Sequence, residues 1–445
     1  MKVGEKTGET KMGEPKMGES KTEKSKQTIT RRDWLKMMGM GGIGLLLGYF
    51  GGSGLLAPSF KFAKSPGNTV PAQRTNGQVP FYGTHQAGIS TPPQNFLCFA
   101  AFDVTTNKLS ELASLFRAWT EAAAAMCSGK LVGTQNEHPH LPPSDTGEAA
   151  GLGPSRLTIT FGVGPSLFDR RFGLASKRPP ALADLPRFPG DNLQSEWCGG
   201  DIGVQVCADD LQVAFHAVRN LARIARGAAV LRWMQEGFQR LGTPGQINET
   251  PRNLLGFKDG TVNPDVNDKK VMNQVVWVQP SDGPAWMVHG TYMVVRRIRM
   301  HIEIWDRTTL SEQEATFGRY RKSGAPLGMK DEFDPLPLDA KNEKGEWVIP
   351  WNSHVRLAHG NGTEQILRRS YSYSSGMDTR TGKLDAGLVF ICFQRDPRKQ
   401  FIPIQQRLAA NDKLNEYIVH VGSAVFACLP GTRAGGYIGE TLFGS

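Results

Sequence analysis

Hydrophobic residues alternate with small or polar residues over 157–163 and again over 202–207. A period of two residues places successive side chains on opposite faces of a strand, so both segments are predicted strands. Over 109–119 and 211–225 the hydrophobic residues recur every three or four positions, which predicts helices with one buried face. With two short apolar runs added, the order is strand, helix, strand, strand, helix, strand over residues 96–103, 109–119, 157–163, 202–207, 211–225 and 229–234. This order is typical of a ferredoxin-like unit.

The second half of the chain repeats the plan less regularly. Charged residues alternate with aliphatic ones over 297–304, which predicts a strand with one solvent-facing side. Residues 388–393 are apolar throughout, which predicts a strand that is buried on both faces. Helices are predicted near 311–321 and 404–418, and a last strand near 421–429.

We therefore expect an α+β fold made of two ferredoxin-like domains, in which antiparallel sheets carry helices packed on them. The predicted N-terminal domain spans residues 96–250, and the predicted C-terminal domain spans 251–445. Residues 320–352 form an insert rich in Asp, Lys, Gly and Pro. Because this insert is too long and too polar for an ordinary turn, it is predicted to be a functional surface loop.

The start of the chain has a different character. Residues 1–30 consist mainly of Gly, Lys, Glu, Thr, Ser and Met, which predicts a disordered polar tail. Within residues 31–63, the pair Arg31-Arg32 precedes the uncharged stretch 37–60, and this pattern indicates a twin-arginine export signal. A transmembrane anchor is the alternative, but frequent glycines make this stretch a poor membrane helix.

Residues 64–95, rich in Pro, Gly, Gln and Thr, are predicted to be an extended arm. The signal implies the twin-arginine translocase as a partner and export to the periplasm, the cell surface or the extracellular space. Since this route carries proteins that are already folded, often with a cofactor inserted beforehand, we expect a cofactor protein.

Composition excludes several other classes. The 445 residues are 39% hydrophobic and 21% charged, as in a globular protein, and this argues against wholesale disorder. The net charge is +10, but residues 1–36 hold ten Lys/Arg against six Asp/Glu, so +6 remains for the other 409 residues. Without a zinc-finger spacing or an RNA-binding signature, we expect no nucleic-acid partner. The six cysteines form no CxxC pair, and we expect no metal-thiolate site.

Residues 255–264, LGFKDGTVNP, fall between the two predicted domains. Two glycines flank one acid in a GxxDG pattern, which lets the backbone approach a ligand while the carboxylate of Asp259 keeps a fixed direction. Taken alone, the pattern favours an ordinary surface turn over a ligand site.

The same segment resembles the signature of the dye-decolorizing haem peroxidases. The resemblance continues, in the family order, through PFYGTHQAG at 80–88, NSHVRL at 352–357, ILRR at 366–369 and GLVFICFQRDP at 387–397. It covers about residues 78–445. The export signal and YSYS at 371–374 make the chain similar to the exported branch that is linked to bacterial iron uptake.

The resemblance implies one haem b per chain, bound mainly in the C-terminal half. It assigns His354 as the iron ligand, with Asp259 and Arg368 as catalytic residues on the opposite face of the haem. It implies further haem contacts by Gly260, Thr261, Val262, His359, Gly360, Asn361, Arg368 and Phe390. We expect Glu416 to accept the hydrogen bond of the second ring nitrogen of His354. Arg369 is either a propionate partner or a surface charge.

Three functions follow from the resemblance. The first is a peroxidase that reduces hydrogen peroxide and oxidises dyes, phenols or ferrous iron. The second is a deferrochelatase that releases iron from haem and leaves the tetrapyrrole intact. The third is a non-catalytic haem carrier of an iron-uptake system. Expected partners are hydrogen peroxide and a reducing substrate; iron-permease components and a second copy of the chain are further candidates.

Overall fold

The computed structural model describes residues 77–135, 138–240, 250–379 and 381–444. The predicted polar tail and export signal lie outside these residues, as does the first part of the predicted arm. The remainder of the arm, residues 77–95, contains no helix or strand. In the part of the chain that the structure describes, no helix has the length and apolar character needed to span a membrane.

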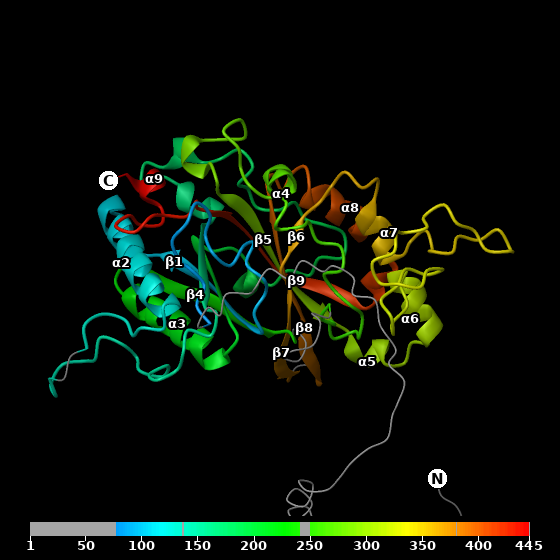
Figure 1. The fold of residues 1–445 in the computed structure, drawn as a ribbon, viewed down its shortest axis with the longest axis horizontal. Coiled ribbons are helices and arrows are strands. Elements are labelled where there is room, and N and C mark those ends of the chain that lie inside the picture. Colours follow the sequence, from blue (N-terminus) through cyan, green and yellow to red (C-terminus); the bar gives the residue numbers. More distant parts are fainter. Residues whose placement is uncertain (1–76, 136–137, 241–249, 380, 445) are drawn as a thin grey trace, which may run out of the picture. The chain divides into compact units, whose positions relative to one another are not determined.

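The N-terminal half has the element order that the hydrophobic pattern predicts. Its elements are β1 (Phe96–Val104), α2 (Leu109–Cys127), β2 (Thr158–Val163), β3 (Ile202–Ala208), α3 (Leu211–Ile224) and β4 (Ala229–Phe238). The strands pair antiparallel in the order β2-β3-β1-β4, and α2 and α3 lie side by side against them (Figure 1). Asp210 caps α3, because its side chain accepts from the backbone nitrogens of Gln212 and Val213.

The C-terminal half repeats this arrangement with longer insertions. Its main elements are β5 (Thr291–Met300), β7 (Tyr371–Asp378), β8 (Lys383–Gln394), α8 (Phe401–Asn411) and β9 (Ile418–Cys428). The strand order β7-β8-β5-β9 matches the N-terminal order strand for strand. The prediction of two ferredoxin-like units is therefore confirmed.

The two sheets join edge to edge. Strand β9 pairs with β2 at Gly162↔Cys428, and β4 pairs with β7 at Phe238↔Ser372, so that the strands close into a barrel. Gly203 faces the ring of Phe426 and Gly162 faces its Cβ, and a Cβ at either glycine would lie 2.8 Å from that side chain. These two glycines therefore provide the space in which Phe426 fills the barrel interior.

The remaining helices gather mainly in the C-terminal half, where α5, α6, α7 and α8 lie near one another (Figure 1). Among the described residues, the short elements are α4 (Lys269–Val275), α5 (Ile302–Trp305), α6 (Leu310–Phe317), α7 (His354–His359), β6 (Leu367–Arg368), α9 (Glu440–Phe443) and the 3-10 helices Pro165–Phe168, Ala175–Lys177, Ser195–Trp197, Ala285–Met287 and Lys413–Glu416. The insert 320–352 contains no helix or strand, as predicted for a loop.

Two predictions for the C-terminal half are wrong. Strand β5 begins and ends earlier than the predicted strand 297–304, and it has no solvent-facing side: of the predicted alternating charges, Arg297 is 4% exposed and the side chain of Arg299 is 15% exposed. Each arginine pairs with an acid, Arg297 with Asp385 and Arg299 with Asp378. Charged residues with such partners can be buried, so the alternation did not mark a solvent-facing side. The predicted helix 404–418 ends early, since α8 stops at Asn411.

A separate hydrophobic cluster supports the C-terminal helices. It joins the residues before Asp259 to the ends of β5 and β8 and to α5 and α6, through Leu255, Phe257, Ile298, Met300, Trp305, Phe317, Leu388, Leu414 and Tyr417. The rings of Phe257 and Phe317 stack with centroids 4.1 Å apart, and Phe317 meets the imidazole of His354 edge-on at 6.0 Å. Both the GxxDG segment, through Phe257, and His354 therefore pack against the ring of Phe317.

His420 on β9 is a buried histidine among charged groups. Its Nδ1 lies 3.9 Å from Oδ1 of Asp191, but Arg296 occupies that carboxylate. Burial and the nearby Arg296 lower the pKa of His420 to about 3.

We expect His420 to weaken the fold in acid. The unfolded chain binds a proton at this residue near the ordinary pKa of 6.5, whereas the folded chain does so only near 3. Between pH 6.5 and about pH 3, the free energy of unfolding therefore decreases as the pH is lowered. This residue accounts for a decrease of about 1.4 kcal/mol per pH unit. Urea unfolding of the haem-free protein at pH 7 and pH 5 measures the effect. The variant His420→Gln should lose less stability than the wild type, and equal losses would contradict this explanation.

Candidate functional site

His354 is the first residue of α7, directly after Ser353, whose hydroxyl donates to the carbonyl of Pro350 at 2.7 Å. The imidazole Nδ1 lies 2.6 Å from Oδ2 of Asp412. The Asp412 side chain is 2% exposed, whereas that of His354 is 31% exposed. Asp412 therefore occupies Nδ1 as an acceptor and leaves Nε2 as the nitrogen that is available to a metal.

The prediction of Glu416 as that acceptor is wrong. The residue is exposed at the end of the 3-10 helix Lys413–Glu416, whereas Asp412 lies one turn earlier. Asp412 caps this helix, because its Oδ1 accepts from the backbone nitrogen of Leu414 at 2.9 Å. The error has a physical cause. The predicted helix 404–418 ran past Asn411, where α8 ends, and included the separate 3-10 helix that begins at Lys413.

The electrostatic surroundings of His354 link it to the other predicted residues. Burial alone would lower the pKa of His354, but the carboxylate of Asp412 outweighs it and raises this pKa overall. Asp259 raises the pKa further, and Arg368 acts in the opposite direction. Both groups therefore lie within electrostatic range of the imidazole.

Asp259 and Arg368 contact each other although 109 positions separate them. Nη1 of Arg368 donates to Oδ1 of Asp259 at 3.0 Å. The two side chains are 23% and 26% exposed, so the pair is only partly covered by protein. Arg368 lies on β6, which pairs with β8 at Cys392. The structure thus brings together the acid and the guanidinium that the sequence suggested, within electrostatic range of the imidazole.

Asn263 holds the backbone of Arg368 in register with the GxxDG segment. Its Oδ1 accepts from the Arg368 nitrogen at 3.1 Å, and its Nδ2 donates to the Arg368 carbonyl at 2.9 Å. The side chain of Asn263 therefore satisfies both backbone groups of one residue in another segment. Asn263 therefore keeps the segment that carries Asp259 beside the segment that carries Arg368.

The residues after Asp259 form an open turn. Gly260 has φ +112°, and a Cβ built there would meet no atom within 4 Å. Val262 is 65% exposed, and Thr261 donates its hydroxyl to Oε1 of Glu332 at 2.9 Å. The open space at Gly260 and the exposed Val262 leave this turn free to contact a bound group.

The predicted residues after His354 lie at the end of α7. His359 and Asn361 are exposed, and Asn361 accepts from the Thr363 nitrogen at 3.1 Å. Gly360 faces the guanidinium of Arg407, which lies 2.5 Å from a Cβ built at that glycine. Arg407 is paired in turn with Glu364 at 3.1 Å.

Phe390 is half-buried on β8, with its ring 6.0 Å from that of Phe401. Because alternate residues of a strand share a face, Phe390 lies on the same face as Cys392, the partner of Arg368. Its position therefore agrees with a place beside the guanidinium.

Arg369 is neither a surface charge nor part of the group around His354. Its side chain is 3% exposed and donates to the carbonyl of Thr91 and to Oε1 of Gln94. Arg369 directly follows β6 and continues its pairing, since its backbone nitrogen donates to the carbonyl of Ile391 at 2.8 Å. It attaches residues 91–94 to the barrel.

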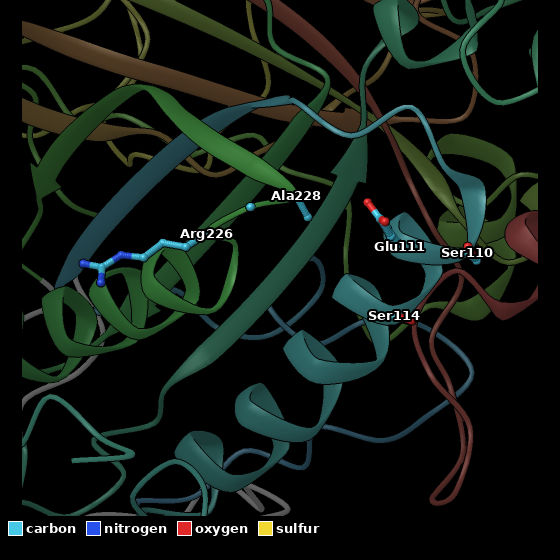
Figure 2. A pocket seen from close by; sticks show the side chains of 6 residues that line it. Ser110, Glu111, Ser114, Arg226 and Ala228 are labelled. Carbon is cyan, nitrogen blue, oxygen red and sulfur yellow. The ribbon is translucent and has the colours of Figure 1, made fainter. Parts of the chain in front are cut away.

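A pocket of about 430 Å³ lies elsewhere, between the start of α2 and the turn after α3 (Figure 2). Its lining includes Ser110, Glu111, Ser114 and Arg226, and Figure 2 shows Arg226 pointing away from Glu111. Glu111 is already engaged by Lys108 at 2.8 Å. None of the predicted site residues lines this pocket. Within the described ranges, no group of three or more His, Cys, Asp or Glu side chains could hold a metal ion.

The fold and the residues around His354 place the chain in a known class. The family model of the N-terminal domain of Dyp-type peroxidases matches residues 86–239, and the model of the C-terminal domain matches residues 250–433. The chain belongs to the Dyp-type peroxidase family. It is a haem peroxidase, an oxidoreductase with haem as its cofactor.

Individual relatives are similar over most of the chain. Deferrochelatase of Escherichia coli strain K12 is 43% identical over 399 residues, which cover 88% of this chain and 93% of that protein. Deferrochelatase of Shigella flexneri is 42% identical over 404 residues, covering 89% and 94%. The solved structure of ferric DtpA from Streptomyces lividans has a TM-score of 0.76 at 39% identity, covering 82% of this chain and 97% of DtpA.

Proposed function

We propose that the haem lies between His354 and the pair Asp259 and Arg368. The donor set fits such a group: an imidazole that is 31% exposed, with one nitrogen held by a buried carboxylate, is the arrangement that histidine ligands of haem iron require. In this proposal Nε2 of His354 binds the iron. Phe390 covers the face above it, and the contacts at the porphyrin edge are made by Gly260, Thr261, Val262, His359, Gly360 and Asn361.

The reaction that this site supports best is the reduction of hydrogen peroxide, followed by oxidation of dyes, phenols or ferrous iron. When bound, haem would supply the electrons that break the O–O bond, and the reducing substrate would return them. The carboxylate of Asp259 takes the proton from one peroxide oxygen and returns it to the oxygen that leaves. The guanidinium of Arg368 donates hydrogen bonds to the negative charge that develops on the leaving oxygen.

One observation carries this proposal: the 3.0 Å contact between Asp259 and Arg368, two groups that both act electrostatically on His354. Binding of haem alone requires neither an acid nor a guanidinium at this place. The pair therefore favours catalysis over the third function, a haem carrier.

The second candidate function is the release of iron from haem. Relatives with more than 40% identity over nearly nine-tenths of the chain bear the name deferrochelatase. Both activities would use the same residues, and we favour the peroxidase because the Asp259–Arg368 pair has a direct role in O–O cleavage.

Assays on the purified, haem-loaded protein separate the two activities. With hydrogen peroxide and a phenolic or dye substrate, we expect catalytic oxidation over many turnovers. With excess haem and a reductant but no peroxide, we expect no metal-free porphyrin in the fluorescence spectrum. Release of at least one metal-free porphyrin per protein chain, without turnover of peroxide, would contradict the peroxidase function and support the deferrochelatase function.

We further propose export by the twin-arginine translocase to the periplasm, the cell surface or the extracellular space. The pair Arg31-Arg32 and the uncharged stretch 37–60 support this proposal. Iron-permease components would be partners if the protein serves iron uptake, and a homodimer is a further candidate assembly.

A further inference from the structure

Glu332, a residue of the insert 320–352, contacts one residue before Asp259 in the sequence and one residue after it. Its Oε2 forms an ion pair with Nζ of Lys258, the residue before Asp259. Its Oε1 accepts the hydroxyl of Thr261, two residues after Asp259, at 2.9 Å. One carboxylate thus holds the chain on either side of the acid that we place in catalysis.

The contacts of Glu332 are shielded from solvent. Its side chain is 9% exposed and that of Lys258 15%, whereas Asp259 and Arg368 are about a quarter exposed. Burial alone would raise the pKa of Glu332, but hydrogen bonds from Lys258, Thr250 and Thr261 outweigh it and lower this pKa. The carboxylate therefore stays ionised, and a shielded, ionised carboxylate with several donors is better fixed than an exposed ion pair.

The insert is itself attached to the body of the protein near Glu332. Arg319, which is 8% exposed and follows α6, donates to the carbonyls of Glu332 at 2.9 Å and of Gly324 at 2.6 Å. The stem of Lys258 packs on Gly324, since a Cβ there would lie 2.7 Å from Cδ of Lys258. Through these contacts, Glu332 connects the turn to α6 and the hydrophobic cluster beneath it.

Between Asp259 and Asn263, whose side chain bonds to the Arg368 backbone, the turn has few contacts besides those of Glu332. Gly260 adopts φ +112° in open space, with no atom within 4 Å of where a Cβ would stand, so packing does not restrict the turn at this residue. The Asp259 nitrogen donates to the carbonyl of Pro251 at 2.8 Å, which fixes the backbone on one side only. The hydrogen bond from Arg368 holds the Asp259 carboxylate itself, and the contacts of Glu332 with Lys258 and Thr261 hold the backbone on either side of it.

We propose that Glu332 is a positioning residue for Asp259. By holding Lys258 and Thr261, it keeps the Asp259 carboxylate beside Arg368 and directed at the place where peroxide reacts. This inference rests on the proposed role of Asp259. Since a misplacement of about 1 Å can cost about 100-fold in rate, a loosened turn is expected to slow the peroxide reaction.

The test compares Glu332→Gln, Thr261→Val, Asp259→Asn and the double variant Glu332→Gln/Asp259→Asn. Stopped-flow absorption of the haem-loaded proteins gives the rate constant for the reaction with hydrogen peroxide. Hydrogen exchange of residues 255–264 in the haem-free proteins gives the order of the turn. We expect Glu332→Gln to react about tenfold more slowly, with unchanged haem content, and to exchange these amides severalfold faster. Thr261→Val should show a smaller change in the same direction.

The double variant distinguishes positioning from a general loss of structure. If Glu332 acts through Asp259, adding Glu332→Gln to Asp259→Asn should change the rate less than about twofold. Asp378→Asn is the matched control, because Asp378 is 11% exposed and pairs with Arg299 at 2.8 Å; we expect the wild-type rate and wild-type exchange of residues 255–264.

Two results would overturn the inference: a wild-type rate in both Glu332→Gln and Thr261→Val, or the same tenfold loss in the presence and absence of Asp259→Asn. If Glu332→Gln fails to fold, Thr261→Val decides by the same two readouts. A wild-type rate in Asp259→Asn would instead contradict the proposed function, and this inference with it.

Discussion

We expect Asp259→Asn to react with hydrogen peroxide about 100- to 10,000-fold more slowly than the wild type. The amide keeps the size of the carboxylate but cannot accept the proton of peroxide and return it to the leaving oxygen. The contact with Arg368 can persist, because the amide oxygen still accepts from Nη1 at the observed 3.0 Å. Stopped-flow absorption after mixing the haem-loaded protein with hydrogen peroxide measures the rate constant directly.

The other member of the pair gives a parallel result. Arg368→Leu should slow the same step by about 100- to 1,000-fold, because it removes the donor to the developing negative charge. Both variants should retain haem. Asp282→Asn is the control, since Asp282 is 22% exposed, close to the 23% of Asp259, and pairs with Arg395 away from the site. Wild-type rates in both distal variants would remove the basis for the proposed mechanism.

His354→Gly is expected to lose bound haem almost completely on purification. The imidazole Nε2 is the only protein ligand that the proposal gives to the iron, and glycine leaves an opening of the size of the ring. Added imidazole should fill this opening and restore both the haem content and the absorption spectrum. The ratio of Soret to protein absorbance, with and without imidazole, measures the effect. Full haem content with an unchanged spectrum in His354→Gly would show that another residue binds the iron.

The partner of His354 gives a graded form of the same prediction. Asp412→Asn removes the charged acceptor of Nδ1 and should weaken haem binding about 10- to 100-fold, the usual effect of losing such a partner. Glu416→Gln is the matched control, because Glu416 is exposed four residues further along the chain. Transfer of haem to an excess of apomyoglobin measures the difference. Equal transfer rates for the two variants would contradict the role of Asp412.

The hydrophobic pattern predicts the N-terminal half well, because strands such as β2 and helices such as α3 have one clear period each. In β5 the pattern misleads, since Arg297 and Arg299 are charged and yet mostly covered by protein. Their partners, Asp385 and Asp378, are distant in sequence, and no local pattern indicates them. Burial of paired charges is decided by tertiary contacts, which is why the strand boundaries were wrong there.

The candidate site was accessible from the sequence only in part. The GxxDG pattern singled out Asp259, but the resemblance to a family was needed to select His354 and Arg368. Asp412 and Glu332 were missed, because their roles arise from contacts across 58 and 71 to 74 positions of the chain. A cap signal was present at Asp412, since an Asp before a helical turn accepts from its backbone nitrogens, and it could have directed attention there.

The most direct test of the central claim is a crystal structure of the haem-loaded protein. We predict that the iron is bound by Nε2 of His354, with Asp412 on the other ring nitrogen, and that Asp259 and Arg368 face the open side of the iron. Iron bound by a different residue, or Asp259 and Arg368 on the same side of the haem as His354, would contradict this claim.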